Sequence, residues 1–217
     1  MGSSRLPEKV LADIEGKPML GHIIDRLELA KHIDAIVVAT TKNEIDDKIV
    51  NYAKQRKILF FRGPDDILKR FIGAGQKFGA TNIIRICADN PFICWANLDF
   101  MIEKHEESNA DLTFTYKMPV GTGLGNCVIR LRALMEVDKI VKGKLREDID
   151  DYIIDRPNKF KITKLLPRDK NYEKPHIRLT VDTQEDLERV RRIYRSVYKN
   201  KPIILNEVIN YVETNEM

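Results

Sequence analysis

The sequence predicts one α/β domain whose sheet is mostly parallel and is covered by helices on both faces. Short apolar runs alternate with amphipathic helical stripes along the chain, as in repeated β-α units. The apolar runs are continuous rather than alternating, which is typical of strands buried on both faces of a parallel sheet. The length of 217 residues suits one such domain, so we treat residues 1–217 as a single unit.

The expected strands are short apolar runs bounded by polar or turn-forming positions. They cover residues 35–39, 58–61, 82–88, 112–116, 161–166 and 177–181. Residues 118–131 break the β-α rhythm, because they contain Gly121, Gly123 and Gly125. This stretch is predicted to be a loop that enters a further strand.

The expected helices follow from apolar residues that recur every three or four positions. They cover residues 19–27, 45–53, 67–78, 95–107, 131–141 and 146–156, followed by a long helix in the last part of the chain. Pro18 is a favourable residue at the start of the first helix. Thr183 is the predicted N-cap of the long helix, because Asp186 stands three residues later in a capping-box-like position.

Composition limits the classes of function. Hydrophobic residues make up 43% and charged residues 32% of the chain, which is the balance of a soluble globular protein. The net charge of +4 is spread out, and the basic residues at 189–195 follow a helical pattern, so we expect no nucleic-acid partner. No run approaches the roughly 18 apolar residues of a membrane span. Three scattered cysteines fit neither a disulfide framework nor a zinc site, and a cytoplasmic location is expected.

Small residues and cations near residue 1 could form a phosphate loop. Gly2, Ser3 and Ser4 let backbone N–H groups approach an anion, while Arg5 and Lys9 add positive charge. The spacing is not that of a Walker A loop, and composition alone favours a flexible tail instead. No apolar run precedes this loop in the sequence, so we expect the sheet to lack its first strand.

Two aspartates follow apolar runs at predicted strand ends. Asp89 comes after residues 83–88, and Asp182 comes after residues 177–181. Ligands of open α/β sheets bind beyond the carboxyl ends of strands, and magnesium (Mg2+) favours one or two carboxylates together with phosphate oxygens and water. Each aspartate alone fits a turn or a helix cap better. The pair, beside a phosphate loop, indicates a shared Mg2+ site.

Other polar residues stand at strand exits or entries. Arg62 follows the second expected strand and could face a nucleotide, while Asp66 fits a helix cap equally well. His176 and Arg178 lie at the entry of the last expected strand, where they could bind an anionic substrate or pair with surface carboxylates. No nucleophile–base motif stands out, which suits phosphoryl or nucleotidyl transfer, because that chemistry relies on positioning and charge neutralisation.

Six motifs occur along the chain in a specific order. They are MGSSRLPEK (residues 1–9), GKPML (16–20), VVATT (37–41), RGPDDILKR (62–70), RICADNP (85–91) and RLTVDTQEDL (178–187). Together they resemble the cytidylyltransferase family, which includes CMP-sialic acid synthetase and 3-deoxy-manno-octulosonate cytidylyltransferase. The most similar branch is that of the spore-coat polysaccharide biosynthesis protein F. The resemblance runs over nearly the whole chain.

The resemblance implies a three-layer α/β/α nucleotide-diphospho-sugar transferase fold of Rossmann-like type. It also implies transfer of a cytidylyl group from CTP to a sugar or sugar acid for surface polysaccharide biosynthesis. Arg5, Lys9 and Asp89 would be catalytic, and Asp89 with Asp182 would hold Mg2+. The implied nucleotide contacts are Gly2, Ser3, Ser4, Arg5, Lys9, Ala39, Thr40, Arg62, Asp66 and Arg85. Members are usually homodimers, with residues 118–160 on the sugar side and at the partner contact.

The sugar-side motifs depart from the family pattern. Residues 123–128 (GLGNCV) lack both carboxylates of Gly-Leu-Asp-x-Glu-Val, and residues 146–149 (REDI) lack the histidine of Arg-Glu-His-Val. Glu8 also stands where glycine is usual. Two alternatives therefore stay open: a catalytically silent nucleotide-binding or assembly module, and a glycosyltransferase on a similar fold. The D-x-D spacing of a glycosyltransferase occurs at residues 148–150, within a helical pattern.

Overall fold

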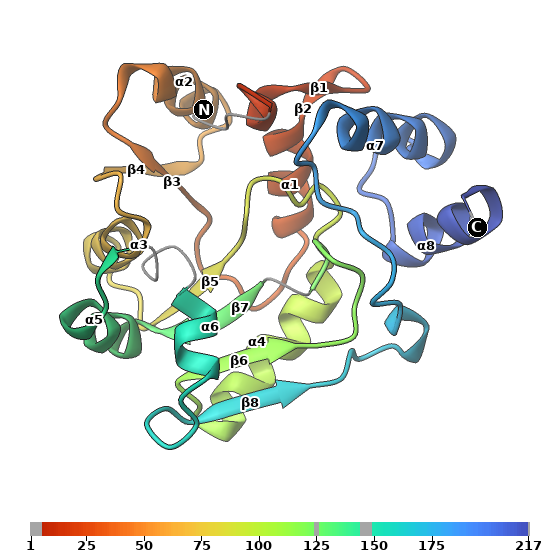
Figure 1. The fold of residues 1–217 in the computed structure, drawn as a ribbon. Helices are drawn as coiled ribbons and strands as arrows, with labels where there is room; N and C mark the ends of the chain where they lie inside the picture. Colours follow the sequence, from red (N-terminus) through yellow and green to blue (C-terminus); the bar gives the residue numbers. More distant parts are fainter. Residues whose placement is uncertain (1–5, 124–125, 144–148, 217) are drawn as a thin grey trace.

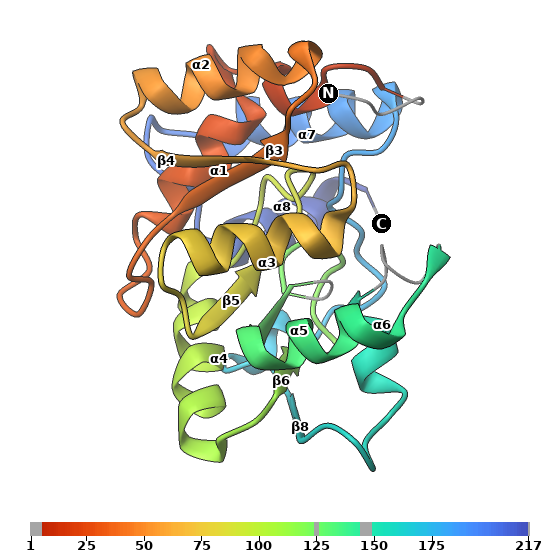
Figure 2. The ribbon, with the colours of Figure 1, turned by 90° about the vertical axis from the view of Figure 1, so that its left-hand side faces the viewer.

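The computed structural model describes residues 6–123, 126–143 and 149–216 (Figure 1). Apart from a small hairpin, its strands form two sheets with helices packed on them. The smaller sheet pairs β3 (Val37–Thr41) in parallel with β4 (Leu59–Gly63). Figure 2 shows α2 above this pair and α3 below it, and both helices contact both strands. The two strands that were predicted in this part of the sequence are confirmed, with their bounds shifted by one or two residues.

The larger sheet has the strand order β5-β7-β6-β8. Its strands are β5 (Asn82–Arg85), β7 (Cys127–Arg130), β6 (Leu112–Thr115) and β8 (Ile162–Leu165). The pairing of β7 is antiparallel to both β5 and β6, whereas β6 and β8 are parallel. The expectation of a mostly parallel sheet is therefore wrong for this part. Among the described residues no helix links β6 to β7, so β7 returns beside β6 in the opposite direction.

The helices occupy the predicted positions and add one that was not predicted. They are α1 (Met19–Leu27), α2 (Asp47–Gln55), α3 (Ile67–Lys77), α4 (Trp95–Ser108), α5 (Leu131–Ile140), α6 (Ile149–Ile154), α7 (Gln184–Val197) and α8 (Leu205–Asn215). Pro18 is the N-cap of α1. The predicted capping box of α7 is confirmed: Asp186 N donates to Thr183 Oγ1 at 3.2 Å, and Thr183 N donates to Asp186 Oδ2 at 2.9 Å.

Three further features differ from the prediction. The unpredicted helix is α8, and a small hairpin of β1 (Asp13–Ile14) and β2 (Lys17–Pro18) was not expected either. Residues 177–181 form an extended segment instead of a strand, with one isolated bridge to Val120. In the described part of the chain, the β3–β4 pair and the larger sheet share no ladder. The expected lack of a first strand in the sheet stays a prediction.

Three apolar clusters support these elements: a small one between α1 and α2, and two larger ones. The largest one lies among α1, α4, α7 and α8, where Phe92, Leu98 and Ile193 are fully buried. The second one includes Phe160 and Ile153 and lies beneath α5 and α6. One face of the larger sheet is covered by α4, and the other by α5 and α6 (Figure 2). Over the described residues, no helix has both the length and the apolar character needed to cross a membrane.

Candidate functional site

A lysine and two aspartates meet beyond the end of β5. The Nζ of Lys9 lies 3.0 Å from Oδ2 of Asp89, 3.4 Å from Oδ1 of Asp182 and 2.7 Å from the carbonyl oxygen of Val181. The two aspartates are 80 and 173 positions away from Lys9 in the sequence. The fold thus brings together three of the residues that the sequence singled out. We refer to Lys9, Asp89 and Asp182 as the Lys9 cluster.

Backbone hydrogen bonds hold the three segments of the Lys9 cluster in place. Lys9 begins a 3₁₀ turn, and Asp89 lies in the turn that follows β5. The carbonyl of Asp89 accepts a hydrogen bond from Val181 N at 2.9 Å, which ties the two aspartate-bearing segments to each other. Asp182 N donates to Asp186 Oδ2 at 2.9 Å, so the capping box of α7 fixes the second aspartate. Both carboxylates are therefore positioned by main-chain geometry.

The donor set of the Lys9 cluster fits a magnesium ion that also binds phosphate. The ammonium group acts as a stand-in cation, because it contacts one oxygen from each carboxylate. Mg2+ is typically bound by one or two protein carboxylates, with substrate phosphates and water completing its coordination. Among the described residues, no group of three or more His, Cys, Asp or Glu side chains could hold a metal by itself. Asp89 and Asp182 are the candidate ligands because both carboxylates contact the same cationic group.

Arg178 extends the cluster, whereas His176 stands apart from it. The Arg178 guanidinium forms an ion pair with Asp182, and Thr180 Oγ1 donates to Asp182 Oδ2 at 3.3 Å. More than half of the Arg178 side chain is exposed, at 55%, so it can reach a ligand in solvent. His176 lies in an exposed turn just before this segment. Arg178 therefore pairs with a carboxylate, one of its two predicted roles, while substrate binding stays a prediction.

Asp46, in the 3₁₀ turn before α2, is a buried carboxylate that binds the end of β3 and was not predicted from the sequence. Asp46 Oδ2 accepts hydrogen bonds from Thr40 Oγ1 at 2.7 Å, Thr41 N at 3.0 Å and Thr41 Oγ1 at 2.5 Å. Burial raises the pKa of Asp46, but the hydrogen bonds from Thr41 and Thr40 outweigh it and hold the pKa well below its ordinary value. Because the Thr40 hydroxyl donates its hydrogen to Asp46, it can only accept a hydrogen bond from a ligand.

Arg62, on β4, binds the loop that follows β3. Its Nε donates to the Thr41 carbonyl at 3.1 Å, one terminal nitrogen donates to the Asn43 carbonyl at 2.9 Å, and the other pairs with Asp47 at 2.5 Å. Ala39 lies two residues before Thr41 and pairs with Phe61 across β3 and β4. The guanidinium of Arg62 therefore holds the loop after β3. Any contact with a nucleotide would be made in addition to these three interactions.

We expect the Asp46→Asn variant to lose about 1–3 kcal/mol of unfolding free energy at pH 7, because a neutral amide oxygen accepts weaker hydrogen bonds than the charged carboxylate it replaces. The folded pKa of Asp46 is lower than its unfolded pKa, so its contribution is complete above about pH 4 and falls as the pH drops. Urea unfolding at pH 7 and pH 3 checks both points. The matched control is Asp47→Asn, whose exposed ion pair contributes little. Equal losses in both variants would contradict the role of Asp46.

The other candidate residues have their own partners or lie outside the described residues. Asp66 caps α3 by accepting a hydrogen bond from Lys69 N at 2.9 Å, as in the helix-cap interpretation. Arg85, at the end of β5, pairs with Asp150 of α6 at 2.5 Å, a partner that no local pattern predicted. Gly2, Ser3, Ser4, Arg5, Gly125, Arg146 and Asp148 lie outside the described residues.

The thiols do not offer a nucleophile. Burial raises the pKa of Cys87, Cys94 and Cys127, so each is held in its protonated form at neutral pH. The three cysteines are free. This agrees with a reaction that proceeds without a covalent intermediate on sulfur.

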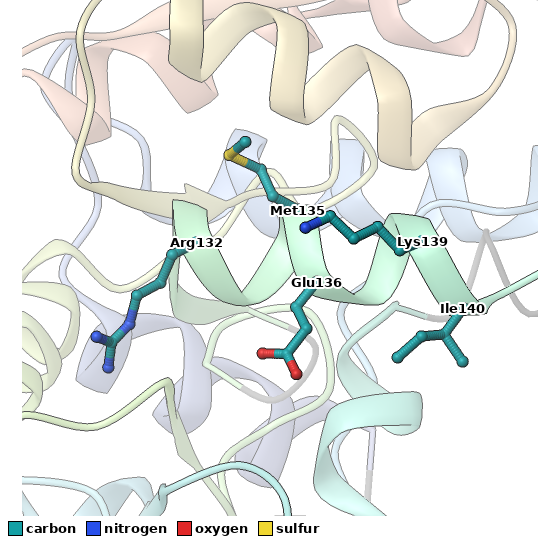
Figure 3. Close-up of a pocket in the computed structure, with 5 residues that line it drawn as sticks. All are labelled: Arg132, Met135, Glu136, Lys139 and Ile140. Atoms are coloured by element: carbon teal, nitrogen blue, oxygen red, sulfur yellow. The ribbon is translucent and has the colours of Figure 1, made fainter.

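A surface hollow elsewhere is formed by a single helix. It is lined by five residues of α5, namely Arg132, Met135, Glu136, Lys139 and Ile140 (Figure 3). Met135 and Ile140 are exposed, while the charged side chains around them point into solvent. None of these residues belongs to the Lys9 cluster. None of the site residues predicted from the sequence lines this hollow.

Comparison with known proteins gives consistent matches over the whole chain. The family profile described as "Cytidylyltransferase" matches residues 1–210. The spore coat polysaccharide biosynthesis protein SpsF of Bacillus subtilis (strain 168) is 28% identical over 222 residues, covering 99% of this chain and 91% of that protein. A solved cytidylyltransferase from Leptospira borgpetersenii serovar Hardjo-bovis (strain JB197) has a TM-score of 0.89 at 27% identity, over 99% and 91% of the two chains. A CMP:2-keto-3-deoxy-manno-octonic acid synthetase complexed with CTP shares the fold, with a TM-score of 0.68 at 18% identity over 90% and 95%.

Proposed function

Since the chain belongs to the cytidylyltransferase family and has its α/β nucleotidyltransferase fold, we propose that it makes a CMP-sugar. The substrates are CTP and a sugar or sugar acid, and the second product is pyrophosphate. The reaction depends on Mg2+ and serves the synthesis of a surface polysaccharide. The relative SpsF, named for spore coat polysaccharide biosynthesis, supports the last point. The solved neighbour that binds CTP supports the choice of base.

The observation that carries this proposal is the Lys9 cluster. Lys9 contacts both Asp89 and Asp182, so a metal ion held by the two aspartates and a triphosphate held by Lys9 would be neighbours. When bound, Mg2+ neutralises charge on the phosphates and polarises the reacting phosphorus. Asp89 and Asp182 hold it, while Lys9 and Arg5 bind phosphate oxygens. Charge neutralisation of this kind is the main requirement of phosphoryl-type transfer.

The proposed step is an in-line displacement. The hydroxyl oxygen of the acceptor forms a bond to the α-phosphorus, while the bond from that phosphorus to the oxygen bridging to the β-phosphorus breaks. The hydroxyl proton passes to solvent, and the bridging oxygen leaves with pyrophosphate. Lys9 and Arg5 stabilise the negative charge that grows on the leaving group. No residue of the chain becomes covalently attached.

Further residues are proposed to contact the nucleotide and the acceptor. The nucleotide is held by Gly2, Ser3, Ser4, Arg5, Lys9, Ala39, Thr40, Arg62, Asp66 and Arg85. His176 and Arg178 bind the acceptor, and the 55% exposure of the Arg178 side chain supports this for Arg178. The protein acts as a homodimer, with residues 118–160 at the partner contact. The nucleotide contacts and the dimer follow from the family resemblance, and the roles of His176 and Arg178 follow from their place at the entry of residues 177–181; all are open to substitution tests.

The experiment measures pyrophosphate release with CTP, UTP, GTP and ATP against a panel of neutral sugars and sugar acids. We expect turnover with CTP in the presence of Mg2+, and none after the metal is removed with EDTA. Calorimetric titration of CTP with Mg2+ is run beside the assay. Restoring Mg2+ after EDTA is the control that the protein has stayed intact.

Each result separates the alternatives. Binding of CTP without turnover across the panel would favour the catalytically silent module. Transfer from a nucleotide-sugar to an acceptor, without pyrophosphate, would favour the glycosyltransferase. Robust pyrophosphate release with CTP alone among the nucleotides supports the cytidylyltransferase.

A further inference from the structure

We propose that Lys9 keeps the metal site closed to free divalent cations, so that the site takes up a metal only together with a triphosphate. This inference rests on the proposed function, because it concerns the same two aspartates. It assigns Lys9 a second role besides phosphate binding. The ammonium group is an internal cation that must be displaced before the metal can bind.

The Lys9 ammonium group is fully engaged in the structure. Its donors are directed at Asp89, Asp182 and the Val181 carbonyl, at 3.0, 3.4 and 2.7 Å. An ammonium group has three N–H donors, and each has an acceptor here. Only 13% of the Lys9 side chain is exposed, so this is not a solvated surface lysine. The ammonium group thus bridges the two carboxylates.

The same carboxylate oxygens are the ligands that a divalent metal needs. A metal entering beside the ammonium group would be repelled by it, since like charges about 4 Å apart oppose each other strongly near a protein surface. A metal that displaces Lys9 would leave a mostly buried ammonium group without its partners, which is also unfavourable. Free Mg2+ therefore competes with an internal cation for Asp89 and Asp182.

A triphosphate removes this obstacle. Its oxygens offer Lys9 new charge-assisted hydrogen bonds, so the ammonium group can leave the aspartates without losing its partners. The aspartates are then available to a metal that arrives on the same phosphates. Because binding free energies are linked, the nucleotide promotes metal binding to the protein and the metal promotes nucleotide binding.

The local backbone suits a movement of the side chain alone. The turn that begins at Lys9 is held by hydrogen bonds from Leu11 N to the Glu8 carbonyl at 2.9 Å and from Ala12 N to the Lys9 carbonyl at 3.1 Å. The lysine stem is a flexible chain of four carbons that can redirect its charge over several ångströms. The exchange therefore needs no rearrangement of the fold.

The test measures binding of Mn2+, used as a spectroscopic probe for Mg2+, by electron paramagnetic resonance in the absence of nucleotide. We expect weak binding to the wild-type protein. The neutral variants Lys9→Met and Lys9→Gln should bind Mn2+ more tightly, by roughly 5- to 150-fold, the usual range of coupling between two sites. Lys9→Arg, which keeps the charge, should remain close to the wild type.

Two controls define the site. Lys104→Met removes a cation from an ion pair with Glu107 on α4 and should leave Mn2+ binding unchanged. Adding Asp89→Asn to Lys9→Met should abolish the gained affinity, because it removes one of the two carboxylates. Circular dichroism and thermal unfolding with Mn2+ confirm that each variant is folded.

The outcomes separate the inference from the proposed function. Unchanged Mn2+ affinity in both neutral variants would overturn the exchange role of Lys9, even if Asp89→Asn weakens metal binding in the presence of CTP. If Asp89→Asn has no effect on metal binding in either background, the metal site itself is elsewhere and both proposals fail. Tighter binding in the neutral variants that depends on Asp89 supports both.

Discussion

The Asp89→Asn variant is expected to lose turnover with CTP by about 10³-fold or more, comparable to or larger than the loss of one preorganised charge-stabilising group in an active site. The substitution keeps the shape of the side chain and removes its negative charge. The Asp89 main chain, which accepts a hydrogen bond from Val181 N at 2.9 Å, is unaffected. The loss should therefore appear in turnover far more than in stability.

A continuous pyrophosphate assay with CTP, Mg2+ and the acceptor that gives turnover in the panel of sugars provides the measurement. The matched control is Asp111→Asn, because Asp111 is also partly buried, pairs with Arg132 at 3.1 Å and accepts from Lys161 N at 3.0 Å. That variant should lose stability and keep its turnover. Turnover of Asp89→Asn at the wild-type rate would remove Asp89 from the metal site.

Local sequence signals predicted the helices well. A helix start depends on a few neighbouring residues, so Pro18 and the pair Thr183 and Asp186 identify α1 and α7 without knowledge of the rest of the chain. The apolar periodicity likewise gave the positions of α3 and α4. These features are encoded within a span of ten to fifteen residues, where the pattern itself is sufficient evidence.

The direction of the strands and the last helix were harder to predict from the sequence, because both depend on distant parts of the chain. The apolar pattern of β7 does not reveal that it runs antiparallel to β5 and β6. Residues 177–181 have the composition of a strand, but their hydrogen bonds go to Val120 and Asp89 in two separate segments. The helix α8 starts at Leu205 after Pro202 and Ile203, and its N-terminal contact, from Ile204 N to Glu207, involves no typical cap residue.

The sequence was enough to predict which segments contribute to the candidate site, but not which residues form ion pairs or hydrogen bonds with each other. The rule that ligands lie beyond strand ends selected Asp89 and Asp182, and the fold brings both to Lys9. Asp46 could not be selected, because it is one of several acidic residues near the start of α2, and only its burial distinguishes it. The partner of Arg85, Asp150, lies 65 positions away, beyond the reach of any local pattern.

The second large effect is expected from Phe92, because its ring links the two segments that carry the aspartates. Phe92 lies three residues after Asp89 and is 0% exposed. Its ring stacks on Tyr194 of α7, the helix that follows Asp182, with ring centroids 5.1 Å apart. The Tyr194 hydroxyl also donates to the Pro91 carbonyl at 3.1 Å. This aromatic contact therefore helps to set the separation of the two carboxylates.

We expect Phe92→Ala to lose about 3–5 kcal/mol of unfolding free energy, a large part of the roughly 5–15 kcal/mol that stabilises a typical domain. Urea unfolding measures this loss. Phe160→Ala is the matched control for stability, because Phe160 is 2% exposed but belongs to the cluster beneath α5 and α6. Similar losses in the two variants would indicate that both rings act as ordinary core residues in folding.

The milder pair Phe92→Leu and Phe160→Leu then separates packing from function. Both variants should fold, since leucine keeps much of the buried apolar volume. Only Phe92→Leu should weaken Mn2+ binding in the Lys9→Met background, because only Phe92 packs between the segments that hold Asp89 and Asp182. An equal effect of the two leucine variants on Mn2+ affinity would mean that general stability, and not the aromatic contact, keeps the carboxylates in place.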